Sequence, residues 1–263
     1  MPAGNLDWPR RKMRVLVTND DGVDAEGFGV LVAFAIEQGF DVLAAAPAVD
    51  VSGSGTSRSV PVTGDISITS HRLPSLPGFR AHTVTGPPAL IVSAACQGIF
   101  GPPPELVLAG INEGANIGRV LHSGTVGAAL TAQRYQQPGI ALSIDGTASP
   151  HWRTALLAFE HLLPLALATK EDRPPVVLNI NAPNIPPADL RGIRAAAPAR
   201  QSATHFTLTI ARPGIVQAGY RHVALPRLQG DAAALAAGYA TVTALRAVEE
   251  DTTVQLPVPR WPD

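Results

Sequence analysis

The segment from Arg14 to Gly22 (RVLVTNDDG) leads from apolar and β-branched residues directly into two adjacent carboxylates. An apolar run without polar alternation is typical of a strand that is buried on both faces, as in a parallel sheet. Asp20 and Asp21 cannot both be buried there without partners, because desolvating an unpaired charge costs too much free energy. The segment therefore predicts a divalent cation at the carboxyl end of this strand, where open α/β sheets bind their ligands. A simpler interpretation places both aspartates in the first turn of the following helix.

The composition excludes several classes of partner. The 20 Lys and Arg residues nearly balance the 21 Asp and Glu residues, so a net charge of -1 provides no electrostatic footprint for a nucleic acid polymer or an anionic membrane. The single cysteine, Cys96, excludes an internal disulfide and is expected to be an inert, buried thiol. No segment has the roughly 18 apolar residues that a membrane span needs, and residues 1–12 contain no apolar secretory stretch. These features predict a soluble, cytoplasmic protein.

Strand and helix patterns alternate from residue 13 to residue 185, which predicts an α/β fold with a mostly parallel sheet. After the first strand, further strands are expected at 41–46, 80–85, 105–109, 139–144 and 175–180. Helices are expected at 27–38, 86–97, 126–135 and 152–163. A small hairpin is expected between 60–63 and 66–69, with Gly64-Asp65 between the two strands.

Beyond Asn181 the pattern changes. Prolines cluster there, and residues 204–211 alternate as an antiparallel strand does. A short helix is expected at 231–238 and a final strand at 240–245. The expected organisation is a disordered leader at 1–12, a catalytic core at 13–185 and an α+β appendage at 186–263 that packs on the core and takes part in oligomerisation.

Oxygen-bearing side chains follow three of the predicted parallel strands. Asp20 and Asp21 follow the first strand, Ser52 follows the second, and Asn112 follows the strand at 105–109. Parallel strands end at one edge of a sheet, so these side chains are expected to converge. Two carboxylates, a hydroxyl and an amide oxygen suit Mg²⁺, Mn²⁺ or Ca²⁺ better than Zn²⁺.

A second polar group precedes the helix expected at 126–135. Ser123, Gly124 and Thr125 lie at its start, and Asn116 lies a few residues earlier. Free amides, hydroxyls and the helix dipole at such a position bind anions. A metal beside an anion pocket indicates phosphate-ester hydrolysis, in which the cation polarises a phosphoryl oxygen. Alternatively, Asn112 and Asn116 are only turn residues and Ser123 only caps the helix.

These motifs, in this order, resemble those of the SurE family of metal-dependent 5′/3′-nucleotidases. The resemblance rests on residues 15–22, 46–53, 110–118 and 123–126, with 178–183 and 238–239 as later landmarks. It covers nearly the whole chain from Met13. It implies a Rossmann-like, three-layer α/β core with an exchanged C-terminal segment that builds homodimers or homotetramers.

The resemblance also implies three sets of site residues. The implied metal ligands are Asp20, Asp21, Ser52 and Asn112. The implied catalytic residues are Asp20, Asp21, Asn116, Ser123 and Thr125. The implied phosphate-binding residues are Asn116, Arg119, Ser123, Gly124 and Thr125. The implied ion is Mg²⁺ or Mn²⁺, and the implied substrate is a nucleoside monophosphate.

The sequence departs from the family pattern in several places. Pro87 and Leu90 stand where a threonine and an aspartate are usual, and Arg119 stands where acidic residues are common. His122 replaces a tyrosine, and Thr131 replaces a glutamate. A guanidinium beside the phosphate would favour a substrate with a second anionic group. Two alternatives therefore remain: a phosphatase dedicated to a non-nucleotide biosynthetic phosphate ester, and a homologue that binds metal and phosphate without turnover.

Other phosphate-handling enzymes are excluded by single residues. A phosphoaspartyl phosphatase of the haloacid-dehalogenase type needs Asp-x-Asp, but Gly22 lies two residues after Asp20. A P-loop kinase needs Gly-Lys-Ser or Gly-Lys-Thr, and neither Lys12 nor Lys170 has that context. A dinucleotide-binding dehydrogenase needs a glycine triplet where the two aspartates lie.

Overall fold

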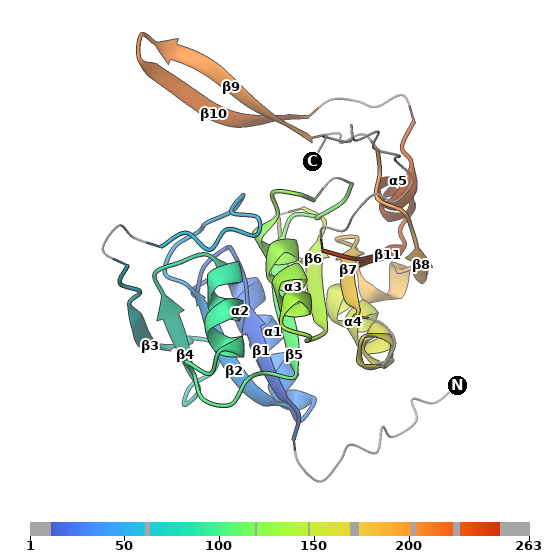
Figure 1. The fold of residues 1–263 in the computed structure, drawn as a ribbon. Helices are drawn as coiled ribbons and strands as arrows, with labels where there is room; N and C mark the ends of the chain where they lie inside the picture. The colour runs from blue at the N-terminus through green and yellow to red at the C-terminus, as the bar shows by residue number, and fades with distance from the viewer. Residues whose placement is uncertain are drawn as a thin grey trace, which may run out of the picture.

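A nine-stranded sheet forms the centre of the computed structural model (Figure 1). The structure describes residues 12–60, 64–118, 120–146, 148–168, 174–200, 204–222 and 227–247. The strands of this sheet are β1 (Arg14–Thr18), β2 (Asp41–Pro47), β3 (Ile68–Arg72), β4 (Arg80–Val84), β5 (Leu106–Glu113), β6 (Gly139–Ile144), β7 (Val177–Ala182), β8 (Ile193–Ala195) and β11 (Ala240–Leu245). Their spatial order is β3-β4-β2-β1-β5-β6-β7-β11-β8.

Six adjacent strands, from β4 through β2, β1, β5 and β6 to β7, run parallel to one another. The strand expected at the start of the chain, β1, lies inside this group with β2 on one side and β5 on the other. The strand order therefore reverses at β1, and open α/β sheets bind ligands in the crevice at such a reversal. The predicted α/β fold with a mostly parallel sheet is confirmed.

Helices cover both faces of the sheet and make three layers (Figure 1). The helices are α1 (Glu26–Glu37), α2 (Pro88–Cys96), α3 (Gly124–Arg134), α4 (Trp152–Leu167), α5 (Gly230–Ala236) and a short 3₁₀ turn, η1 (Pro187–Asp189). Val15 and Val17 of β1 belong to one apolar cluster with α1 and α4, whereas Leu16 belongs to another with α2 and α3. Successive side chains of a strand point to opposite faces, so the two helix pairs lie on opposite sides.

Two details differ from the expected elements. The strand expected at 66–69 begins at Ile68 and pairs antiparallel with β4, through the turn 73–79. Residues 61–63, from the other expected strand of that hairpin, lie outside the described part of the chain. The strand expected to end at 109 continues to Glu113, so Asn112 lies within β5 and not after it. Gly110 permits this continuation, because a Cβ there would lie 2.2 Å from the Leu142 carbonyl oxygen of β6.

The C-terminal part of the chain contributes both to the sheet and to a projecting hairpin. The strand β11 pairs antiparallel with β7, and β8 pairs parallel with β11. The strands β9 (Thr204–Arg212) and β10 (Ile215–His222) form a separate two-stranded sheet that extends away from the rest (Figure 1). The strands expected at 204–211 and 240–245 and the helix expected at 231–238 are therefore present. Within the described ranges, no helix combines the length and the apolar content needed to cross a membrane.

Replacing Phe159 with Ala should lower the free energy of unfolding by about 3–5 kcal/mol. Phe159 of α4 is 1% exposed and packs edge-to-face on Phe34 of α1, with the ring centroids 5.6 Å apart. The control is Leu165→Ala, because Leu165 lies on the same helix but is 48% exposed. Denaturant unfolding of both variants measures the difference, and equal losses would contradict this packing of α4 on α1.

Candidate metal and phosphate site

Asp20 lies at the carboxyl end of β1 and is almost completely buried, with 3% of its surface exposed. The amide of Gly124 donates to its Oδ2 at 3.0 Å, and the hydroxyl of Thr125 donates to its Oδ1 at 2.5 Å. Burial raises the pKa of Asp20, and these hydrogen bonds oppose the rise. The first turn of α3 is thus the partner of the Asp20 carboxylate.

Asn112 of β5 brings a third oxygen to the same place. Its Oδ1 lies 3.1 Å from the Thr125 hydroxyl, and its Nδ2 donates to the Gly114 carbonyl at 2.6 Å. The Thr125 hydroxyl has one proton, so it cannot donate to Asp20 and Asn112 at the same time. One of the two oxygens, Asp20 Oδ1 or Asn112 Oδ1, is therefore left without a hydrogen from Thr125. A hard cation at this place would bind that oxygen.

Asp21 adds the second carboxylate. Its Oδ2 is buried and has no hydrogen-bond partner. Burial, together with the negative charges of Asp20 and Asp50, raises the pKa of Asp21 to about 7. A bound cation would supply the missing partner and favour the charged form of this carboxyl group.

Ser54 is a site residue that the sequence analysis missed. Its Oγ is buried without a hydrogen-bond partner, and a Cβ on Gly124 would lie 2.6 Å from both this Oγ and Asp20 Oδ2. The only signal in the sequence is that Ser54 belongs to a loop rich in hydroxyl groups. Ser52, the predicted ligand in that loop, has an exposed side chain, and its amide donates to Asp50 Oδ1 at 2.7 Å. The loop itself is held at the site, because the Val51 amide donates to the Asp20 carbonyl at 2.8 Å.

Asn116 belongs to a second network, which β6 and β7 hold. Its Nδ2 donates to Ser143 Oγ at 2.9 Å, and its amide donates to Asn181 Oδ1 at 2.7 Å. Its carbonyl accepts from Asn179 Nδ2 at 2.8 Å and from Asn181 Nδ2 at 3.0 Å. Four hydrogen bonds therefore fix both the backbone and the side chain of Asn116 at the carboxyl edge of the sheet. Sequence reasoning missed Ser143, Asn179 and Asn181 as supports of this loop.

The amides at the start of α3 are already bonded, contrary to the expectation that they are free. Those of Gly124 and Thr125 face the Asp20 carboxylate, and that of Val126 donates to Ser123 Oγ at 3.1 Å. Ser123 thus caps the helix, as the simpler interpretation stated. Its hydroxyl accepts that bond and keeps its own hydrogen for donation to another group.

The positions that depart from the family pattern lie around this network rather than in it. His122 is exposed, and its carbonyl accepts from the Gly55 amide at 3.1 Å. Thr131 is buried and donates to the Gly127 carbonyl at 2.7 Å within α3. Pro87 precedes the first residue of α2, and Leu90 lies in its first turn. Arg119 lies outside the described residues, so the expectation of a second anionic group on the substrate stays a prediction.

The donor chemistry fits a hard divalent cation. The structure brings Asp20, Asp21, Asn112 and Thr125 to one edge of the sheet and offers oxygen atoms only. Across the described ranges, no group of three or more His, Cys, Asp and Glu side chains could hold a metal. A site with two carboxylates and neutral oxygens suits a hard divalent cation and lacks the nitrogen and sulfur ligands of zinc sites.

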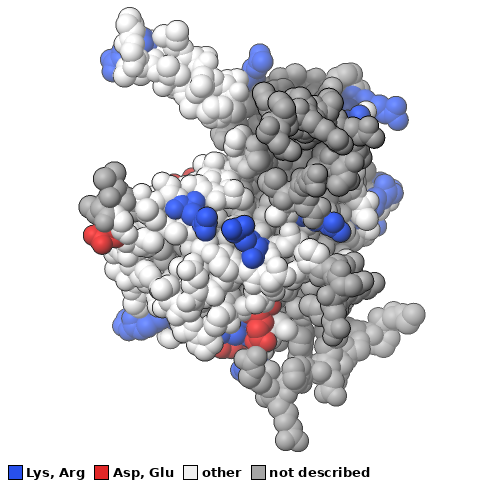
Figure 2. Space-filling view, viewed as in Figure 1, with Lys and Arg blue, Asp and Glu red and all other residues white. Residues whose placement is uncertain are grey.

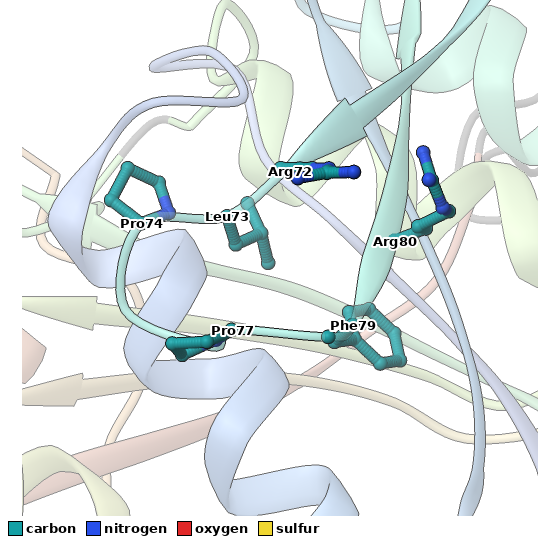
Figure 3. Close-up of a pocket in the computed structure, with 7 residues that line it drawn as sticks. Arg72, Leu73, Pro74, Pro77, Phe79 and Arg80 are labelled. Carbon is teal, nitrogen blue, oxygen red and sulfur yellow. The ribbon is translucent and has the colours of Figure 1, made fainter.

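A hollow of about 450 Å³ lies elsewhere, at the turn between β3 and β4 (Figure 3). Its walls include Leu73, Pro74 and Phe79, and Arg72 and Arg80 lie at one side. It shares no residue with the network around Asp20. The candidate site is therefore defined by the strand ends and not by this hollow.

The chain is similar to several known proteins. Residues 15–205 match the family described as survival protein SurE. A 5′-nucleotidase SurE of Syntrophobacter fumaroxidans is 38% identical over 184 residues, which cover 69% of this chain and 71% of that protein. A 5′-nucleotidase SurE of Rhodopseudomonas palustris is 33% identical over 247 residues, which cover 89% and 93%. The SurE protein of Aquifex aeolicus shares the fold, with a TM-score of 0.71, 24% identity and coverage of 91% of this chain and 96% of that one.

Replacing Gly124 with Ala should abolish most of the stabilisation that a divalent cation gives. A Cβ at this position would lie 2.6 Å from Asp20 Oδ2 and 2.8 Å from Asp20 Cβ, so Asp20 would have to move. The measurement is the rise in Tm when Mn²⁺ is added to chelator-treated protein, because a ligand that binds only the folded state stabilises it. The control is Gly219→Ala in β10, where the new Cβ meets one atom at 3.7 Å. An unchanged Mn²⁺ response in Gly124→Ala would contradict the site.

Proposed function

Because this chain belongs to the SurE family, we propose that it is a divalent-metal-dependent phosphomonoesterase that hydrolyses nucleoside monophosphates. The range that matches the family, residues 15–205, spans Asp20, Asp21, Asn112, Asn116 and Thr125. The observation that carries the proposal is the convergence of Asp20, Asn112 and Thr125, because it assembles an oxygen-only site at the reversal of strand order. The names of the relatives favour a nucleotide over the non-nucleotide ester and over a homologue without turnover.

The metal site in this proposal is made by Asp20, Asp21, Asn112 and Ser52, with Ser54 as a neighbouring hydroxyl. A divalent ion, Mg²⁺ or Mn²⁺, supplies a Lewis acid for the phosphoryl oxygen when bound. The hydrogen bonds of Gly124 and Thr125 hold the Asp20 carboxylate in one orientation before any ligand arrives. Preorganisation of this kind lowers the reorganisation needed during the reaction.

Asn116 and Ser123 are proposed to position the phosphate. Ser123 can donate its hydroxyl hydrogen to a phosphoryl oxygen while its Oγ still caps α3. The Nδ2 of Asn116 has a second hydrogen beyond the one that Ser143 accepts. In this proposal Gly124 and Thr125 support the site by orienting Asp20, through the Gly124 amide and the Thr125 hydroxyl, rather than by binding the phosphate directly.

Asp20→Asn and Asp21→Asn should each lower kcat by roughly 10² or more, because each removes a negative charge from the proposed cation site. Phosphate release from nucleoside monophosphates is measured after chelation and after Mg²⁺ or Mn²⁺ is restored. The Mg²⁺ or Mn²⁺ concentration that gives half-maximal activity should also rise as the pH drops below about 7, because protons compete with the cation for Asp21, whose pKa without the cation is raised to about 7. The control is Asp41→Asn, since Asp41 is exposed at the opposite end of β2. Full activity in either site variant would contradict the proposal.

A homodimer or homotetramer is proposed to form through the β9–β10 hairpin. Phe206, Leu208 and Ile210 alternate along β9, and Val216 of β10 lies opposite Ile210, so these four residues share one face. All four side chains are exposed, at 58–82% of their surface. The hairpin carries few charged atoms in the view of Figure 2. An exposed apolar face of this kind marks an interaction site.

Light scattering at micromolar concentration should therefore find a dimer or a larger assembly. Leu208→Asp should shift the population toward the monomer, because it places a charge on the apolar face. Thr209→Asp is the matched control, since its side chain points to the other face of the same strand. A monomeric wild-type protein would overturn this part of the proposal.

A further inference from the structure

Asp231, at the start of α5, is a buried carboxylate that binds three segments of the chain. Its side chain is 1% exposed. The Gly118 amide donates to its Oδ2 at 2.8 Å, and the amides of Ala199 and Ala232 donate to its Oδ1 at 2.8 Å each. Hydrogen bonds from amides to a carboxylate are about twice as strong as neutral ones, so this group holds the three segments firmly.

Two of these segments flank the β9–β10 hairpin along the chain, and together they are named the hairpin base. Ala199 lies just before the hairpin in the chain, and Asp231 and Ala232 follow soon after it. The Asp231 amide also donates to the Ala197 carbonyl at 2.9 Å. Asp231 therefore joins the segment that precedes the hairpin to the segment that follows it.

The third segment is the loop that carries Asn116. Gly118 lies two residues after Asn116 in this loop, is buried, and approaches Ala199 so closely that a Cβ on it would lie 3.0 Å from the Ala199 carbonyl oxygen. At its other end the loop is bonded to Asn181 and Ser143. The loop is thus clamped between the β6–β7 edge on one side and Asp231 on the other.

We propose that Asp231 is a positioning residue that couples the base of the β9–β10 hairpin to the Asn116 loop. If the hairpin base moves, Gly118 must move with it. Otherwise a buried amide that donates to Asp231 loses its partner, which costs free energy. A contact that holds the hairpin consequently also holds Asn116 in place. The effect of this coupling on catalysis rests on the proposed function, in which Asn116 positions the phosphate. Asp231 lies beyond residues 15–205, the part that matches the family.

The test compares Asp231→Asn with the wild type by amide hydrogen exchange and by steady-state kinetics. An amide side chain cannot accept from Gly118 and from Ala199 together through oxygen, so one of these contacts must be lost. We expect exchange at Gly118 and at Ala199 to accelerate together, by about tenfold or more, while β1 and β5 keep their protection.

We also expect KM to rise by about tenfold with a smaller change in kcat, because the phosphate-positioning loop is loosened while the Asp20 network is untouched. Asp189→Asn, at an exposed aspartate of η1, is the control.

A role limited to stabilising α5 gives a different result. Tm then falls, but KM and exchange at Gly118 stay as in the wild type, and that outcome would overturn the proposal. If Asp231→Asn does not fold, Gly118→Ala replaces it, because at φ +68° an alanine strains the backbone of Gly118 and its Cβ presses on the Ala199 carbonyl while the Asp231 side chain is kept. Its expected effects are the same, and unchanged exchange at Ala199 would overturn the coupling. The exchange measurement needs no turnover, so faster exchange in a protein inactive on every phosphate ester would support the coupling and refute only the proposed function.

Discussion

The burial of the Asp20 carboxylate is the interaction on which the candidate site depends. A carboxylate with 3% exposure at the end of a central strand needs hydrogen-bond donors, because an unpaired buried charge is too costly. Gly124 and Thr125 provide them from a part of the chain more than 100 residues away. The helix α3 must therefore begin at the end of β1. Since the Thr125 hydroxyl also contacts Asn112, the same requirement fixes β5 beside them.

The polar edge of the sheet has two halves, which the segment from Asn112 to Gly118 connects. The half around Asp20 is built from β1, β5 and α3 and contains the closely spaced oxygens that suit a cation. The half around Asn116 is built from β6 and β7, whose asparagines pair with the loop backbone. The C-terminal α5 supports that second half through Asp231. The metal and the phosphate would therefore be held by different parts of the fold, and Asp231 links the phosphate side to the segment that precedes the hairpin.

Most elements of the fold were predictable because their signals are local. The strand at 139–144 was expected with the bounds that the structure has, and α2 and α4 begin within two residues of the expected positions. The continuation of β5 past Gly110 was not predictable, because a glycine weakens a strand interior and nothing local shows that the strand resumes after it. Here the glycine instead allows the close approach of β5 to β6. The pairing of β3 with β4 was missed for a similar reason, since Gly64-Asp65 has the composition of a hairpin turn.

The sequence by itself determined that Asp20 and Asp21 end a buried strand and that oxygen side chains follow its neighbours, because a strand buried on both faces has an unalternated apolar pattern. Only the tertiary structure decided which groups are partners. It assigned the first amide of α3 to Asp20 rather than to a free anion, placed the buried Oγ of Ser54 near Asp20, and bonded Asn116 to Asn179 and Asn181. Each of these pairings joins residues far apart in the chain, and no local periodicity encodes them. They arise from the requirement that buried polar groups find a partner wherever the packed helices and strands bring one within reach.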